Sequence, residues 1–199
     1  KFPLIVKPNC DGSAKGLSVT SVVRSPDKLY EEVKKVFTLY KQEALVEEFI
    51  EGKELTVGIL GDENPTLLPI LEVDFRNCKA SGEFFYSWRM KEFQGDASLH
   101  LVPEFFCPAR LDEETEKAVK DVALKAHRAL GCFDLSRVDI RLSGDNIPYV
   151  LEVNPLPGLD PDESNLTIMT RAANISYNAL INGILKNAQD RYLLKLTGP

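Results

Sequence analysis

Four polar side chains recur at two-residue spacing in the segment RVDIRLSGDNIPYVLEVNP, residues 137–155. Alternating apolar and polar residues on either side of the turn-forming SGDN predict a β-hairpin. With the turn centred between the Asp and the Asn of that motif, Asp139 lies opposite Glu152. In the same register, Arg137 lies opposite Asn154. Because like charges on neighbouring strands repel, two facing carboxylates need an explanation.

One interpretation of this face is a solvated pair of acids, or a register shifted by one residue. The other is a hard cation, because Mg²⁺ binds one or two carboxylates, water and substrate phosphates through oxygen. Glu152 and Asn154 are two residues apart and therefore share a strand face. Arg137 would add a positive charge beside a phosphate or a developing oxyanion. The hairpin alone leaves both interpretations open.

A glycine-rich segment, KPNCDGSAKG at residues 7–16, connects two apolar runs. Its backbone amides could cradle phosphate. It is not a P-loop, because that motif ends in GK[ST] and leads into a helix, whereas here Lys7 precedes the loop. The alternative is a plain connecting loop. Lys7 favours the phosphate interpretation slightly, because a cation at the end of an apolar strand needs an anionic partner.

Two further segments combine polar and apolar side chains. In VEEFIEGKE, residues 46–54, a carboxylate could accept hydrogen bonds from an adenine amino group or from ribose hydroxyls, although the pattern taken alone favours a solvated sheet edge. Residues 77–100 predict a long irregular loop, and such loops are often functional. Its FFYSWRMKEF stretch would either close over a phosphate-bearing ligand as a lid or pack as an aromatic cluster.

Strands and helices alternate along the chain without regular βαβ units, which predicts an α+β fold with antiparallel sheets. We expect strands at residues 2–8, 17–23, 44–60 with a turn at Gly52, 66–75, and in both arms of the hairpin. We expect helices at 25–41 with Ser25 as its cap and Leu29, Val33, Val36 and Phe37 on one face, at 111–131 with Asp112 as its cap, at 165–173 and at 176–195.

The composition is that of a soluble chain with enough length for a substantial core: 199 residues, 44% hydrophobic and 27% charged. Its net charge of −6 argues against general binding to nucleic acid or anionic membranes. The four cysteines form no CxxC motif, so we expect reduced thiols and a cytoplasmic location. No run of the given sequence reaches transmembrane length, and we expect no signal peptide. We expect His127 at the helix surface or boundary.

These segments occur in an order that resembles the ATP-grasp enzymes, specifically the D-alanine–D-alanine ligase family. The residues that carry the resemblance are VKPNCDGSAKGLS, LVEEFIEGKELTV, GCFDLSRVDIRL and VLEVNPLPGLDPDES. The resemblance covers nearly the whole chain and begins partway through the family's central domain, so we expect the C-terminal two-thirds of such a protein. It implies two α+β lobes with antiparallel or mixed sheets that clamp a nucleotide. Residues 1–54 would be the rest of the central lobe, and 55–199 the C-terminal lobe with the lid at about 77–100.

The resemblance also implies roles for individual residues. Arg137 would stabilise the tetrahedral transition state, and Ser13 in the glycine loop would lie near the second substrate. The ATP-binding residues would be Lys7 on the phosphates, Glu47 on adenine, Glu48, Phe49 and Ile50 along the base, Glu54 on ribose and Lys91 on the γ-phosphate. Two Mg²⁺ ions, or Mn²⁺ in their place, would be held by Asp139, Glu152 and Asn154. The acceptor carboxylate would be held by Gly158 and Ser164.

The implied reaction is ATP-driven amide formation through an acyl phosphate, with D-alanine as both substrates, for peptidoglycan precursors. The implied partners are ATP and small amino acids, and a homodimer is an option for the full-length protein. The chain departs from the family at Glu92, where a tyrosine is usual, at Asp11, where glutamate is usual, and in the NPLPGLDPDES loop. These departures concern the acceptor more than ATP. Two alternatives therefore stay open: a ligase with another amino-acid, hydroxy-acid or peptide acceptor, and a non-catalytic nucleotide-binding remnant.

Overall fold

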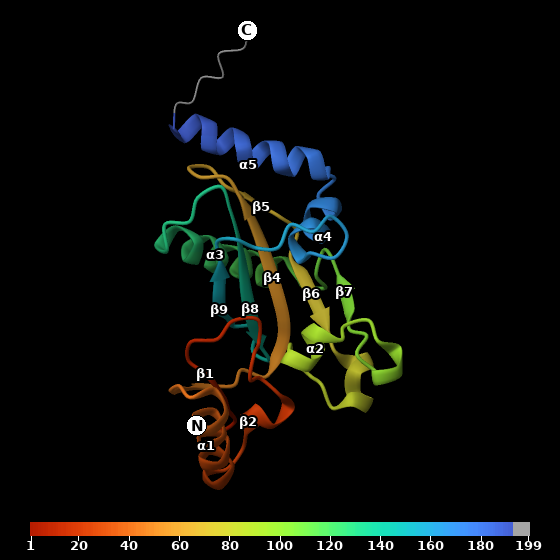
Figure 1. Ribbon diagram of the computed structural model, residues 1–199. Coiled ribbons are helices and arrows are strands. Elements are labelled where there is room, and N and C mark those ends of the chain that lie inside the picture. The colour runs from red at the N-terminus through yellow and green to blue at the C-terminus, as the bar shows by residue number, and fades with distance from the viewer. Residues whose placement is uncertain (193–199) are drawn as a thin grey trace. The chain divides into compact units, whose positions relative to one another are not determined.

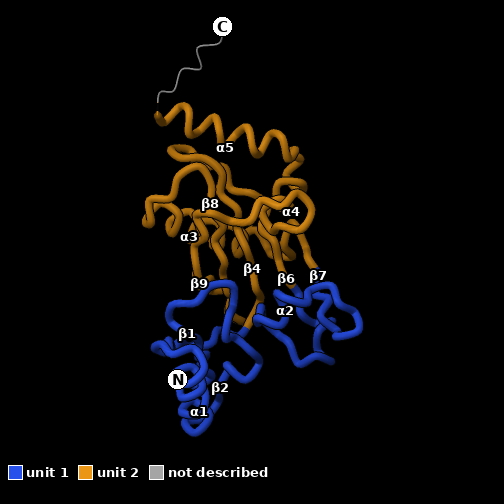
Figure 2. Tube along the Cα trace, viewed as in Figure 1, with its two compact units in different colours: residues 1–51, 74–104 blue, residues 52–73, 105–199 orange. Residues whose placement is uncertain are grey.

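The computed structural model describes residues 1–192, which form two compact units (Figure 2). The first unit joins residues 1–51 with residues 74–104, and the second joins residues 52–73 with the described residues from 105 to 192. The division near residue 52 lies close to the lobe boundary expected after Glu54. The segment 74–104, which we expected in the second lobe, clusters with the first unit instead.

The first unit contains a three-stranded antiparallel sheet in the order β2-β1-β3. Its strands are β1 (Leu4–Pro8), β2 (Val22–Val23) and β3 (Ala44–Glu48). The predicted strand at 17–23 is wrong for most of its length, because the 3-10 helix η1 (Val19–Ser21) precedes β2. The hydroxyl of Ser21 accepts a 3.1 Å hydrogen bond from the amide of Ser18, and this local contact competes with strand pairing.

Helix α1 (Pro26–Tyr40) packs on this sheet, and Ser25 caps it as predicted. Val36 is buried, and Leu29 and Val33 are partly buried against the same cluster. Phe37 was expected on this face but is 55% exposed. At about 100° per residue, Phe37 lies at the edge of the stripe formed by the other three side chains.

The remainder of the first unit is mostly irregular, as predicted, with three short helical segments. These are η2 (Arg76–Ser81), α2 (Trp88–Glu92) and η3 (Ala97–Leu99). The rings of Phe49, Phe84 and Phe85 pack edge to face with centroids 5.1–5.9 Å apart. The aromatic-cluster interpretation of this segment is therefore confirmed for Phe84 and Phe85, and its closure as a lid stays a prediction.

A six-stranded sheet organises the second unit in the order β7-β6-β4-β8-β9, with β5 paired to β4 (Figure 1). Its strands are β4 (Gly52–Leu60), β5 (Thr66–Leu67), β6 (Leu71–Asp74), β7 (Glu104–Phe106), β8 (Leu135–Ser143) and β9 (Pro148–Asn154). Strand β4 pairs antiparallel with β5, β6 and β8, and β8 pairs antiparallel with β9. The strand expected over 66–75 is interrupted around Pro69, whose nitrogen has no hydrogen to donate.

Three helices cover this sheet: α3 (Glu113–Ala129), α4 (Asn165–Ala172) and α5 (Tyr177–Tyr192). Asp112 caps α3 as predicted, and Val119 and Ala123 pack against the apolar residues of β4 and β8. Helices α4 and α5 build a second cluster around Leu166, Met169 and Leu180. The last three residues of the helix predicted to end at 195 lie outside the described residues.

His127 corrects one prediction, because its side chain is buried rather than at the surface. Buried α3 residues follow one another every four positions as Thr115, Val119, Ala123 and His127. This spacing continues the apolar stripe directly into the histidine. In residues 1–192, the cysteines are free thiols and no helix is both long and apolar enough to cross a membrane.

Candidate functional site

The hairpin of β8 and β9 has the predicted pairing at the end that carries the polar side chains. Asp139 pairs with Glu152, and Arg137 pairs with Asn154. The register then shifts between Asp139 and Ile140, so that Ile140 pairs with Val150 and the pairing near the turn differs by one residue from the prediction. Such a bulge increases local twist and often re-aims side chains next to functional sites.

The two facing carboxylates are held together by a cation and an amide. The Nε and Nη2 atoms of Arg137 lie 2.9 Å and 2.7 Å from the two carboxylate oxygens of Asp139. The Nδ2 atom of Asn154 lies 3.2 Å from Asp139 Oδ2 and 3.2 Å from Glu152 Oε1. Arg137 Nη2 is also 3.9 Å from Glu152 Oε1. The repulsion expected from the sequence is therefore offset by donors on the same face.

Exposure increases across this face from Asp139 to Glu152. The side chains of Arg137 and Asp139 are each 19% exposed, whereas the Glu152 side chain is 54% exposed. Asp139 also accepts a 2.9 Å hydrogen bond from the hydroxyl of Thr56, its partner on β4. The exposed carboxylate of Glu152 therefore offers oxygen atoms that a ligand from solvent can reach.

Two residues on this face were not predicted from the sequence. Thr56 contacts Asp139, and Arg141 Nη1 lies 3.1 Å from Glu54 Oε2. The sequence did contain a signal for these residues. Glu54 and Thr56 are two residues apart on β4, and Asp139 and Arg141 are two apart on β8, so each pair shares one face of its strand. This signal could not be used without knowing that β4 and β8 are neighbours, because 83 residues separate Thr56 from Asp139.

The donor set of the hairpin fits a hard cation. Residues 1–192 contain no group of three or more His, Cys, Asp or Glu side chains arranged for a metal, but the hairpin combines two carboxylates with an amide. All three side chains carry oxygen donors. Mg²⁺ needs only one or two protein carboxylates when phosphate and water complete its octahedron. Asp139, Glu152 and Asn154 therefore suit Mg²⁺ bound together with a phosphate.

In the first unit, Lys7 and Glu47 form an ion pair between the adjacent strands β1 and β3. Both side chains are partly exposed, at 32% and 46%. The predicted residues Glu48 and Ile50 flank Phe49, which is buried in the aromatic cluster. Lys7 and Glu47 are thus brought together, whereas Phe49 contacts other rings.

The glycine loop is anchored where it begins, and its tip is exposed. Gln42 accepts a 2.6 Å hydrogen bond from the amide of Cys10 and donates one to Asp11. Ser13 and Ala14 have φ values of 54° and 58°, in the left-handed region. They form a tight turn that is closed by the amide of Lys15, which donates a 3.1 Å hydrogen bond to the carbonyl oxygen of Gly12.

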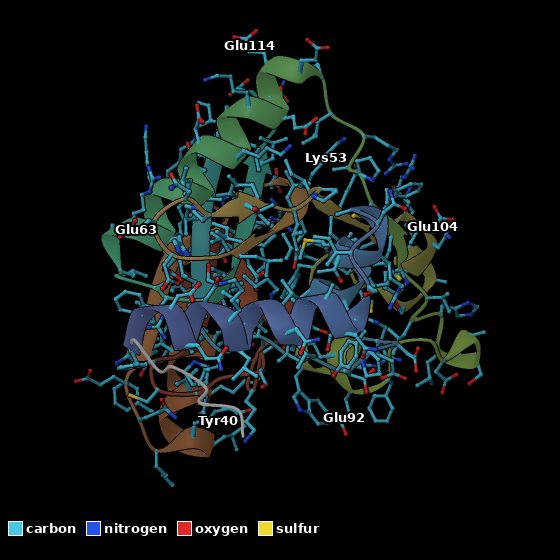
Figure 3. The ribbon with its side chains drawn as sticks, turned by 90° about the horizontal axis from the view of Figure 1, so that it is seen from above. Tyr40, Lys53, Glu63, Glu92, Glu104 and Glu114 are labelled. Carbon is cyan, nitrogen blue, oxygen red and sulfur yellow. The ribbon has the colours of Figure 1, made fainter. Side chains whose placement is uncertain are left out.

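Lys91, the predicted contact of the γ-phosphate, lies on α2. The Nζ atom of Lys91 lies 5.7 Å from the ring centroid of Tyr86, a cation–π contact. The next residue, Glu92, is exposed, and its side chain points away from the helix (Figure 3). Glu92 is the residue at which the sequence departs from the family pattern.

Gly158 and Ser164, predicted to bind the acceptor, are neighbours in the loop before α4. A Cβ atom on Gly158 would lie 2.9 Å from Ser164 Oγ, so a larger residue at 158 would require the Ser164 hydroxyl to shift. The Ser164 hydroxyl accepts a 2.9 Å hydrogen bond from the amide of Asp160. The loop therefore closes on itself and brings the two predicted residues together.

Comparison with solved structures identifies the fold. The chain superposes on the D-alanine–D-alanine ligase of Bacillus anthracis complexed with ATP, with a TM-score of 0.70 and 27% identity, over 96% of this chain and 53% of that one. The antiparallel sheets and the polar hairpin thus form an ATP-grasp fold. The family model described as D-ala D-ala ligase C-terminus matches residues 1–186, and the chain belongs to this family.

Two curated relatives match nearly the whole of this chain. A D-alanine–D-alanine ligase of Fervidobacterium nodosum is 36% identical over 188 residues, which cover 94% of this chain and 54% of the relative. The uncharacterized protein y4sG of Sinorhizobium fredii is 35% identical over 192 residues, 96% of this chain and 54% of that protein. The chain spans about half the length of these relatives.

Proposed function

We propose that this chain carries the ATP-binding and metal-binding residues of a ligase that joins two D-alanine molecules through an acyl phosphate, for peptidoglycan precursors. The observation that carries the proposal is the hairpin face of Arg137, Asp139, Glu152 and Asn154. A structural hairpin has no need to hold two carboxylates opposite each other and neutralise them with an arginine and an amide. A hairpin that receives Mg²⁺ and phosphate does.

The polar residues of the hairpin would have two roles, metal binding and stabilisation of an oxyanion. Asp139, Glu152 and Asn154 would hold Mg²⁺, which when bound neutralises charge on the transferring phosphoryl group. Arg137 would stabilise the oxyanion that forms when the amine attacks the acyl phosphate. No covalent enzyme intermediate is required, so catalysis rests on orientation and electrostatics.

The first unit would bind the nucleotide. Lys7 would exchange its contact with Glu47 for the phosphates, and Glu47 would then accept a hydrogen bond from the adenine amino group. The glycine loop with Ser13 would cover the phosphates, and Lys91 would contact the γ-phosphate. In the second unit, Glu54 would bind the ribose, and Gly158 with Ser164 would bind the acceptor carboxylate.

A different acceptor is the second candidate. The exposed carboxylate of Glu92 replaces a family tyrosine, and the loop after β9 contains Asp160, Asp162 and Glu163, all exposed. Neither change touches the hairpin face. They favour retained ATP chemistry with an altered amino-acid, hydroxy-acid or peptide acceptor.

Phosphate release from MgATP tests these candidates. Release stimulated by D-alanine, and lost in Arg137→Met, supports the D-alanine ligase. Release stimulated only by other amino acids, hydroxy acids or dipeptides supports the second candidate. MgATP binding without release in the presence of any of these acids would support a non-catalytic nucleotide-binding protein.

A further inference from the structure

Asp139 is fully occupied by hydrogen-bond donors from its own unit. Its Oδ1 accepts from Thr56 Oγ1 at 2.9 Å and from Arg137 Nε at 2.9 Å. Its Oδ2 accepts from Arg137 Nη2 at 2.7 Å and from Asn154 Nδ2 at 3.2 Å. A carboxylate offers about four lone-pair sites, so none remains free. A cation therefore reaches Asp139 only if one of these donors leaves.

The donors differ in how readily they can leave. Thr56 is 4% exposed, uncharged and fixed opposite Asp139 by the pairing of β4 with β8. The Arg137 side chain is 19% exposed, longer and positively charged. Because a divalent cation repels a guanidinium at the same carboxylate, Arg137 is the donor in direct conflict with a metal. Asn154 is neutral, and rotation of its amide can exchange a donor for an acceptor.

We propose that Arg137 is an exchangeable internal counterion. It neutralises Asp139 until a divalent cation displaces it, and Thr56 holds Asp139 in position during the exchange. This inference rests on the metal site of the proposed function and adds a sequence of events to it. The guanidinium becomes available to an anionic substrate group only after the metal has bound, which couples metal loading to the readiness of Arg137.

Arg137 and Thr56, which both donate hydrogen bonds to Asp139, therefore have opposite effects on metal affinity. Removing Arg137 removes a competitor and strengthens metal binding. Removing the Thr56 hydroxyl frees Asp139 to rotate and weakens metal binding, as loss of supporting hydrogen bonds around metal ligands usually does. If Arg137 merely supports the fold of the hairpin, its removal weakens metal binding as well.

Titration of the protein with Mn²⁺ alone, followed by the electron paramagnetic resonance signal of free Mn²⁺, measures these affinities. We expect Arg137→Met to bind Mn²⁺ about tenfold more tightly than the parent, because two charge-assisted hydrogen bonds no longer have to be broken. Arg137→Lys keeps the charge but loses the bidentate contact, so its Mn²⁺ affinity should lie between those of the parent and Arg137→Met. Thr56→Val, of nearly the same shape, should bind about tenfold more weakly.

Glu152→Gln separates failure of this inference from failure of the proposed function. If the parent and Glu152→Gln bind Mn²⁺ equally, the cation is not at the hairpin, and the metal site and the exchange are both overturned. If Glu152→Gln loses Mn²⁺ but Arg137→Met binds it no more tightly than the parent, only the exchange is overturned. Should Arg137→Met fail to fold, the same decision rests on Arg137→Lys, for which binding no tighter than the parent's overturns the exchange.

Discussion

The imidazole Nδ1 of His127 on α3 lies 2.8 Å from the hydroxyl of Ser136 on β8, and both side chains are almost completely shielded from solvent. The other ring nitrogen, Nε2, is buried without a hydrogen-bond partner in the described structure. Ser136 directly precedes Arg137, so this contact fixes α3 to the strand that carries the candidate site. A proton added to the ring would place a charge where Nε2 has no acceptor.

His127 makes the stability of the protein depend on pH. Burial lowers the pKa of His127, and this outweighs the opposing charge of Asp62. Neutral histidine is therefore favoured by folding. Its contribution is complete above the unfolded pKa of about 6.5 and is lost as the pH falls through the lower folded value. Urea unfolding at about pH 7.5 and about pH 5 should show a loss of stability on acidification that is smaller in His127→Gln. An equal loss in His127→Gln, with the exposed His100→Gln as the control, would contradict this account.

A second buried contact predicts a cost for removing one carboxylate. Glu72 on β6 accepts hydrogen bonds from the amide and from Nη2 of Arg110, at 3.0 Å and 2.6 Å. Burial acts to raise the pKa of Glu72, but the hydrogen bonds from Arg110 and the charge of Lys53 outweigh burial. The pKa of Glu72 is therefore lowered overall. The contribution of Glu72 to stability is therefore present above the unfolded pKa of about 4.3 and is lost on acidification below that value. Glu72→Gln should cost about 2 kcal/mol of unfolding free energy at neutral pH, measured in urea. A cost no larger than that of the exposed Glu63→Gln would refute the prediction.

Gly52 marks the start of β4 and tolerates no side chain. Its φ is +150°, and a Cβ atom would lie 1.9 Å from the carbonyl oxygen of Leu142 on β8. We expect Gly52→Ala to lower the unfolding free energy by about 3 kcal/mol or more, because backbone would have to move. Gly144 in the hairpin turn has open space around its Cβ position, so Gly144→Ala is the matched control. Similar Tm values for the two variants would show that β4 can begin without this close approach.

Cys10 offers a direct probe of the glycine loop. It is exposed, whereas Cys78 is buried, and burial raises the pKa of Cys107 to about 11. A thiol reagent near neutral pH should therefore modify Cys10 first, and Cys10→Ser should abolish the fast phase. If the loop covers phosphate, MgATP should slow this modification several-fold. A rate that MgATP does not change would argue against phosphate binding by the loop.

Local patterns predicted the elements that carry the site but not all of their connections. The period of two across residues 137–155 gave the correct pairing of Asp139 with Glu152, because both lie on one polar strand face. The same counting failed nearer the turn, since the bulge after Asp139 changes the register without changing the residue pattern. The cap at Ser25 was predictable for the opposite reason, because its hydrogen bond reaches only to Lys28.

Contacts between segments far apart in the chain could not be predicted from the sequence. Thr56 contacts Asp139 because β4 and β8 are neighbouring strands. Both strands are buried against α3, and this shared packing cannot be read from the residues of either strand alone. His127 was misplaced because a histidine was judged by its type instead of by its four-residue spacing from Ala123. The roles assigned to Lys7, Ser13 and Lys91 stay predictions that rest on the family resemblance.

Calorimetric titration with ATP in the presence and absence of Mg²⁺ shows whether the hairpin of β8 and β9 holds the metal. Glu152→Gln is compared with Glu63→Gln, an exposed carboxylate in the turn after β4 with the same chemical change (Figure 3). We expect Glu152→Gln to weaken Mg²⁺-dependent ATP binding by about tenfold or more, and Glu63→Gln to bind like the parent. If Glu152→Gln retains its fold and binds MgATP as tightly as the parent, the hairpin is not the metal site.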